Sequence, residues 1–160
     1  IMDVLQAAGI ATACATLAAV TGRSLLAAIM PREADRRLIA AASYAVQVVG
    51  CGAFLLSHGS EPWLIWTGVA LFGLGIGNVV YLPPLIAQTE FASPDVPRVV
   101  ALTVALGQAL YAFAPATFGL LREALPPGTG PGDAPAVNAL SAAVFIAAIV
   151  TLLVGRRPHQ

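Results

Sequence analysis

The chain alternates between long apolar runs and short segments that hold all of its charged residues. Each run has at least 19 residues and contains no Asp, Glu, Lys or Arg; the runs are Val4–Gly22, Leu38–Ser57, Pro62–Thr89, Val99–Leu121 and Ala134–Gly155. About 20 apolar residues in a helix cross the hydrocarbon core of a bilayer, and a charge at its centre costs at least about 2.5 kcal/mol. The pattern predicts an all-α, polytopic transmembrane helix bundle with five spans, in a single domain over residues 1–160.

Composition supports the same environment. Of the 160 residues, 58% are apolar and only 10% are charged, whereas an ordinary soluble domain has about 25% charged residues. The chain cannot cover a water-soluble surface, so we expect the lipid bilayer to be its main partner. The formal net charge is zero and no basic face is evident, which argues against nucleic acid as a partner.

The arginines between the runs predict an orientation. Five spans place the first link, the third link and the C-terminal tail on one side, and these segments carry seven of the eight arginines. Cytoplasmic segments are enriched in Arg and Lys, so we expect a cytoplasmic C-terminus. An N-terminus that starts outside, opening with Ile1-Met2-Asp3 and no charged leader, is typical of a chain truncated upstream. The missing N-terminal part of the same protein is therefore an expected partner.

The third and fourth spans contain residues that shape helices. Gly73 and Gly77 form a small-xxx-small face that suits close helix packing, and no flanking strand supports a nucleotide-binding loop. Pro83 and Pro84 remove two backbone donors and should kink or break the third span, and Pro115 loosens the fourth.

The same two spans carry polar side chains at membrane depth. Asn78 and Tyr81 lie three residues apart in the third span, and Gln108 and Tyr111 repeat that spacing in the fourth. Each pair shares one helix face. Such residues either hydrogen-bond neighbouring helices or line a substrate pathway, and the spacing leaves both interpretations open.

No catalytic constellation is present. His58 and His159 lie outside the runs, and Glu90 is expected to be a solvated residue at the end of the third run. No His, Cys, Asp or Glu cluster has metal-ligand spacing. We therefore expect no enzyme activity, no metal and no cofactor, although an upstream segment could hold catalytic groups.

The order of these features resembles the C-terminal half of a transporter of the major facilitator superfamily. The resemblance covers nearly the whole chain and rests on four motifs in this order: Gly22-Arg23, a basic link with Asp35-Arg36-Arg37, a glycine-rich span closing on Pro83-Pro84, and a span with Gly107 followed by Ala114-Pro115-Ala116-Thr117-Phe118-Gly119. By this resemblance the five spans correspond to helices eight to twelve of twelve.

The resemblance also implies roles. The family has a basic signature in the matching link, where Asp35 and Arg36 fit its Asp-Arg pair, Pro31 replaces its leading glycine and its later glycine is missing. Arg23, Asp35, Arg36 and Arg37 would form a cytoplasmic gating loop. The third span would line the central cavity, the first and fourth would meet the other half, and the second and fifth would face lipid.

Together these observations favour secondary active transport of a small-molecule substrate by alternating access. Asn78 and Tyr81 would contact the substrate, while Gln108 and Tyr111 would support or gate it. The expected location is a bacterial inner (plasma) membrane. The alternative is a non-transporting membrane subunit or scaffold, in which the same polar residues only hold helices together.

Overall fold

The computed structural model describes residues 2–31, 34–58, 60–124 and 135–155, and its secondary structure there is entirely helical. The helices are α1 (Met2–Ile29), α2 (Arg36–Ser57), α3 (Pro62–Glu90), α4 (Val96–Ala124) and α5 (Pro135–Val154). All five are long and apolar enough to cross a membrane. The all-α fold and five helices of membrane-spanning length are thereby confirmed for the described residues, and the chain is suited to a multi-pass membrane protein.

One helix is longer than the apolar run that predicts it. The first apolar run ends before Arg23, but α1 continues through Arg23 to Ile29. A charged residue limits the segment that hydrocarbon can surround. It does not end the helix, because the helical backbone can continue past it. The residues after Arg23 are Ser-Leu-Leu-Ala-Ala-Ile, which are mostly good helix formers. The other helix ends lie within three residues of the predicted limits.

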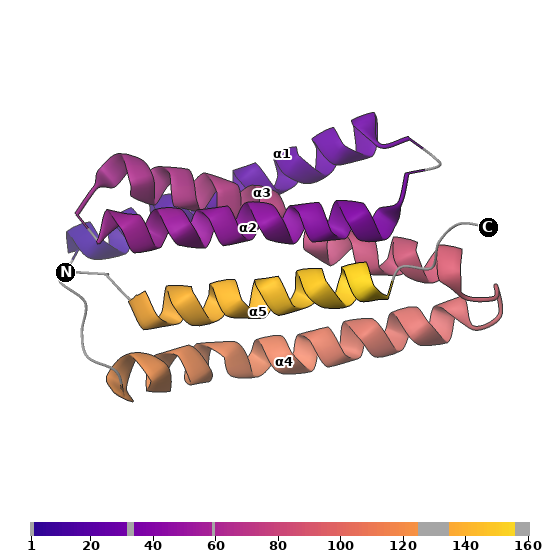
Figure 1. The fold of residues 1–160 in the computed structure, drawn as a ribbon. Coiled ribbons are helices and arrows are strands. Elements are labelled where there is room, and N and C mark those ends of the chain that lie inside the picture. The colour runs from indigo at the N-terminus through magenta and orange to yellow at the C-terminus, as the bar shows by residue number, and fades with distance from the viewer. Residues whose placement is uncertain (1, 32–33, 59, 125–134, 156–160) are drawn as a thin grey trace.

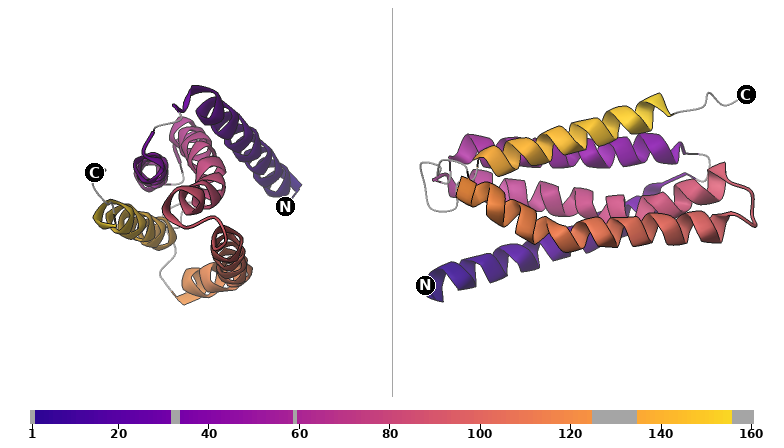
Figure 2. Two further views of the ribbon diagram at one scale, coloured as in Figure 1. Left: turned by 90° about the vertical axis from the view of Figure 1, so that its right-hand side faces the viewer. Right: turned by 90° about the horizontal axis from the view of Figure 1, so that it is seen from below.

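The helices run up and down as one antiparallel set (Figure 1). The end of α1, the start of α2, the end of α3, the start of α4 and the end of α5 therefore lie at one end of the bundle. Seen end-on, α3 lies between α1 and α2, α5 lies beside α2, and α4 lies at the edge (Figure 2). Residues 125–134, which connect α4 and α5, lie outside the described residues.

The contact between α2 and α3 forms the main buried layer. One face of α2 is small or polar along its length, and its buried residues are Ala40, Ala41, Ser43, Gln47, Gly50, Cys51, Ala53 and Ser57. Glycine has no Cβ atom; one added to Gly50 would lie only 3.2 Å from the carbonyl oxygen of Gly68. The Phe54 ring packs against Gly68, and the Gln47 side chain packs against Gly75. At Gly75 a larger residue would also meet the Ser43 carbonyl oxygen, which is 2.8 Å from the Cβ position, so the backbone would have to shift.

The opposite side of α3 packs on α1 in the same way, through close backbone contact at glycine residues. The position of a Cβ on Gly73 or Gly77 overlaps the carbonyl oxygen of Ala15 or Ala19, respectively. Gly22 of α1 makes a similar contact, because a Cβ atom added there would lie 2.9 Å from the Leu74 carbonyl oxygen of α3. Small residues in membrane helices allow backbones to approach closely, and packing then supplies the association energy.

α2 packs between α3 and α5 and supplies most of the buried residues among those described. Phe145 of α5 joins the layer, with its ring centroid 5.8 Å from that of Tyr44 and 5.9 Å from that of Phe72. Among the described residues, neither α4 nor α5 contributes a buried side chain within its membrane-spanning part.

The α1–α3 contact gives the first testable prediction. We expect Gly77→Ala to lower the free energy of unfolding by about 1–3 kcal/mol, because the new methyl group meets backbone atoms of Ala19 that cannot rotate away. Gly107→Ala is the matched control, since nothing lies within 4 Å of its Cβ position; removing a helical glycine there should stabilise by up to about 1 kcal/mol. Unfolding in mixed detergent micelles measures both. Equal effects at the two positions would contradict the close crossing.

Candidate functional site

The residues expected in a gating loop lie at the start of α2. Asp35 is the N-cap of this helix, and its Oδ1 accepts hydrogen bonds from the backbone N–H groups of Arg37 at 3.0 Å and Leu38 at 3.2 Å. A carboxylate at this position satisfies free donors of the first turn and interacts favourably with the positive end of the helix dipole. Arg36 and Arg37 are therefore helical residues that follow the link rather than part of a loop.

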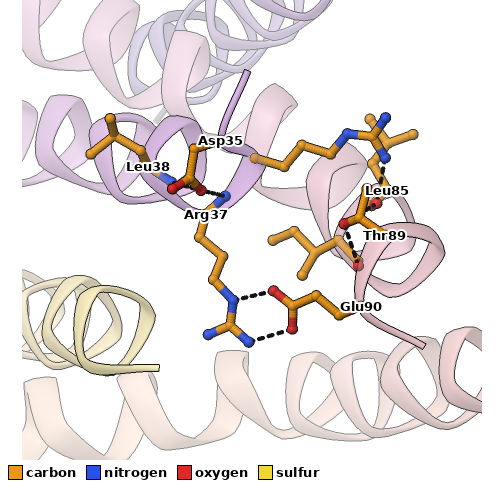
Figure 3. A network of polar contacts seen from close by, with 8 residues as sticks. Asp35, Arg37, Leu38, Leu85, Thr89 and Glu90 are labelled. Atoms are coloured by element: carbon orange, nitrogen blue, oxygen red, sulfur yellow. Dashed lines mark hydrogen bonds and ion pairs between the residues drawn. The ribbon is translucent and has the colours of Figure 1, made fainter. Parts of the chain in front are cut away.

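Arg37 links three helices at this end of the bundle. Its Nε and Nη2 donate to the two carboxylate oxygens of Glu90, the last residue of α3, in a bidentate ion pair (Figure 3). Its Nη1 also lies against Gly155, just beyond the end of α5. The Arg37 and Glu90 side chains are 23% and 34% exposed, so water weakens the pair but does not surround it.

Arg36 binds the backbone of α3. Its Nη1 donates to the carbonyl oxygen of Leu85 at 2.6 Å, one turn before α3 ends. Two arginines at a helix N-terminus are unfavourable for their own helix dipole. Here they reach the C-terminal ends of neighbouring helices, where the dipole is negative and favours a cation. The start of α2 is thus attached electrostatically to the end of α3.

Arg23 does not take part in this cluster. It is exposed on α1, and no hydrogen bond or ion pair involves its side chain among the described residues. Three arginines that entered the orientation argument, Arg32, Arg156 and Arg157, lie outside the described residues. The cluster that the structure assembles is Asp35, Arg36, Arg37 and Glu90.

Asn78 and Tyr81 have different surroundings although they share a face of α3. Asn78 is half-buried, its Nδ2 donates to the Leu74 carbonyl oxygen at 3.2 Å, and its buried Oδ1 has no hydrogen-bond partner in the part of the chain described. Tyr81 is 38% exposed and makes no side-chain hydrogen bond to a described residue. Asn78 therefore turns its amide into the bundle, and Tyr81 leaves part of its ring uncovered.

Gln108 and Tyr111 are exposed on α4. Tyr111 is 73% exposed, and within the described ranges neither side chain has a hydrogen-bond partner. No hydrogen bond between described residues joins this pair to Asn78 or Tyr81, and α4 makes few contacts with α3. The four expected substrate contacts are consequently not gathered at one point in this structure.

The prolines lie inside continuous helices. Pro83 and Pro84 are within α3, and Pro115 is within α4. A proline has no N–H for the carbonyl four residues before it, so the carbonyl groups of Val79 and Val80 lose their usual helical donors. Of the two expected effects of the proline pair, a kink or a break, a break does not occur, because α3 continues to Glu90 and buries Leu82 completely.

Two residues of this arrangement were not singled out from the sequence. Glu90 was expected to be solvated. It lies 53 residues from Arg37 in the sequence, so the sequence gives no sign of their ion pair. Gln47 is 1% exposed and fits against Gly75. A glutamine in the middle of an apolar run is the signal that could have indicated it, since buried amides require partners.

Comparison with protein-family models, curated proteins and solved structures finds no match. The resemblance to the major facilitator superfamily therefore rests on the residues of this chain, chiefly Asp35-Arg36-Arg37 at the start of α2 and the proline pair in α3. The physical observations support a coarser description. The part of the chain that the structure describes is all-helical, with five helices that are suited to crossing a membrane.

Proposed function

We propose that the chain forms part of a secondary active transporter that moves a small molecule by alternating access. In such proteins two halves rock around a site near the middle of the membrane. The five helices would correspond to helices eight to twelve of a twelve-helix protein of the major facilitator superfamily. The upstream part of the polypeptide would supply the other half and the remaining helix.

The observation that carries this proposal is the uncovered polar surface of α4. Gln108 and Tyr111 lie at membrane depth, yet they are exposed and without hydrogen-bond partners among the described residues. The polar residues Ser43 and Gln47 of α2, in contrast, are buried. Hydrocarbon cannot satisfy an amide or a phenol, so this face of α4 borders water or another part of the protein. A substrate pathway between two halves provides both.

The third helix supplies the other wall in this proposal. Tyr81 is partly exposed, and the carbonyl groups freed by Pro83 and Pro84 lie on the preceding turn. Backbone carbonyls without helical partners are tolerated in membranes where they face a cavity or another helix. Asn78 and Tyr81 would contact substrate, and Gln108 and Tyr111 would support or gate it.

The arginine cluster would act as a latch on the cytoplasmic side. Arg36 and Arg37 attach the start of α2 to the end of α3 through Leu85 and Glu90. A partly exposed ion pair is weak enough to open and close. In the proposed orientation, the C-terminus and this latch face the cytoplasm of a bacterial cell, because the arginines gather at this end.

The alternative is a non-transporting subunit or scaffold. The internal hydrogen bond of Asn78 to Leu74 supports it, because this side chain already serves its own helix. In that case the polar face of α4 would be covered permanently by a neighbouring helix. Access of water to α4 distinguishes the two functions.

Cysteine accessibility provides that test without knowledge of the substrate. After Cys14 and Cys51 are replaced by alanine, we expect Tyr111→Cys and Gln108→Cys to react with a membrane-impermeant maleimide. Leu110→Cys is the matched control, since Leu110 and Tyr111 are 74% and 73% exposed. A thiol reacts as the thiolate, which needs water, so Tyr111→Cys should react at least about tenfold faster than Leu110→Cys. Equal, negligible labelling in whole cells and in inverted vesicles would contradict a transport pathway.

The latch gives a second prediction in the same assay. We expect Glu90→Gln to increase labelling of Tyr111→Cys from the cytoplasmic side by about two- to fivefold, because exposed ion pairs contribute about 0.5–1 kcal/mol. Arg37→Glu should act likewise, and combining it with Glu90→Arg should restore the original rate. Arg98→Gln is the control, since Arg98 begins α4 at the same end and the described residues offer it no ion pair. A latch role is excluded if Glu90→Gln and Arg98→Gln behave alike.

A further inference from the structure

The crossing of α1 and α3 lies near the middle of the bundle, and Arg23 directly follows it. A Cβ atom added to Gly22 would lie 2.9 Å from the carbonyl oxygen of Leu74 and 3.2 Å from its Cα. Leu74 is near the middle of α3. On another face of α3, Gly75 packs against Gln47, which is near the middle of α2. The backbone of α1 at Arg23 is therefore close to the centre of the bundle.

This position is far from the charged end of the bundle. At that end Arg36 donates to the carbonyl oxygen of Leu85, which follows Leu74 by 11 residues, or about 16 Å of helix. The Cα–Cβ bonds of a helix are inclined towards its N-terminus, so the Arg23 side chain starts in the direction away from this end. The part of α1 that is apolar enough to cross a membrane, Leu5–Ile29, includes Arg23. In a bilayer, Arg23 would extend from backbone inside the hydrocarbon layer.

The face of α1 that carries Arg23 is also polar on the turns before it. Thr16 and Thr12 precede Arg23 by seven and 11 residues, so the three share one helix face, and all three are exposed. The Thr16 hydroxyl donates to the Thr12 carbonyl oxygen at 2.8 Å, and the Thr12 hydroxyl donates to the Ala8 carbonyl oxygen at 2.9 Å. These hydroxyl donors serve their own helix, so the guanidinium group is the free donor of this face.

A charged side chain at this depth needs a particular environment. Such residues face the interior of a protein or a water-filled cavity, where an opposite charge can balance them. The five apolar runs contain no Asp or Glu, and Glu90 is held by Arg37 at the end of the bundle. The described helices therefore provide Arg23 with no negative charge at its own depth.

We propose that Arg23 binds the negatively charged group of the transported molecule, which is a small oxyanion such as a carboxylate or a phosphate. A guanidinium group donates two parallel hydrogen bonds to either group. This inference rests on the proposed transport function and names the chemical class of its substrate. An acidic side chain from the upstream part would instead neutralise Arg23 permanently, and the two sources of negative charge give different electrostatic potentials beside α1.

The potential beside Arg23 can be measured without knowledge of the substrate. In the full-length protein without Cys14 and Cys51, Thr16→Cys places a thiol on the same face. We measure its reaction rates with an anionic and a cationic methanethiosulfonate reagent and compare their ratio with that for free 2-mercaptoethanol. A positive charge about 10 Å away attracts the anion and repels the cation, so we expect a ratio at least about threefold higher. Arg23→Gln should abolish this excess, and Arg23→Lys should keep it.

Leu17→Cys is the matched control, because Leu17 lies next to Thr16 at the same depth and is 68% exposed on another face. A thiol reacts as the thiolate, which needs water, so Leu17→Cys should react at least about tenfold more slowly than Thr16→Cys. Equal, negligible reaction of both would place the face of Arg23 in lipid and overturn the proposal. A ratio that Arg23→Gln leaves unchanged also overturns it. So does a ratio that equals the 2-mercaptoethanol value and falls below it in Arg23→Gln, since an acidic residue of the protein then neutralises Arg23.

Labelling of Tyr111→Cys with the maleimide separates this inference from the proposed function. Its rate should be the same with and without Arg23→Gln, which also shows that the variant folds. If Tyr111→Cys reacts but Thr16→Cys shows no preference for the anionic reagent, the anion site is overturned and the pathway remains. If Tyr111→Cys does not react from either side, the pathway and the anion site are overturned together.

Discussion

Close contact of the α3 backbone with two neighbouring helices is the constraint on which the bundle depends. Gly73 and Gly77 bring it against carbonyl groups of α1, while Gly68 and Gly75 bring it against α2. In a bilayer the lipid tails are as apolar as the side chains, so helices gain little from hydrophobic burial and associate through close packing and polar contacts. Without these glycines, α1 and α2 would lose the contacts that hold them on α3.

Close packing also decides which polar groups are enclosed. Gln47 reaches the backbone of α3 only because Gly75 has no side chain. At one end of the same two helices, Arg36 and Arg37 reach the C-terminal turns of α3. The polar residues of α4 lie outside this closely packed part, since α4 makes few contacts with α3 and α5. Polar contacts therefore fix α2 to α3, while α4 keeps polar side chains available for water or a further part of the protein.

Much of the fold could be predicted from the sequence because the bilayer imposes a simple rule. Charge-free runs of sufficient length must be helical spans, and the five predicted runs correspond to α1 to α5. The end of α1 was missed because the rule concerns burial in hydrocarbon, and a charged residue such as Arg23 does not end a helix. The sequence left open whether α3 would be kinked or broken at Pro83 and Pro84, and the helix is continuous. A proline removes one donor, but packing of the buried Leu82 can hold the helix together.

The sequence by itself determined five apolar helices of membrane-spanning length and the end of the bundle at which Arg36, Arg37 and Arg98 lie. Each follows from local composition and length. Only the tertiary structure decided that Glu90 is the partner of Arg37, that Gln47 fits against Gly75, and that α2 packs between α3 and α5. Helix periodicity tells which residues share a face, but it does not tell which neighbour that face meets. That choice depends on how closely two backbones can approach, and this is a property of pairs of helices.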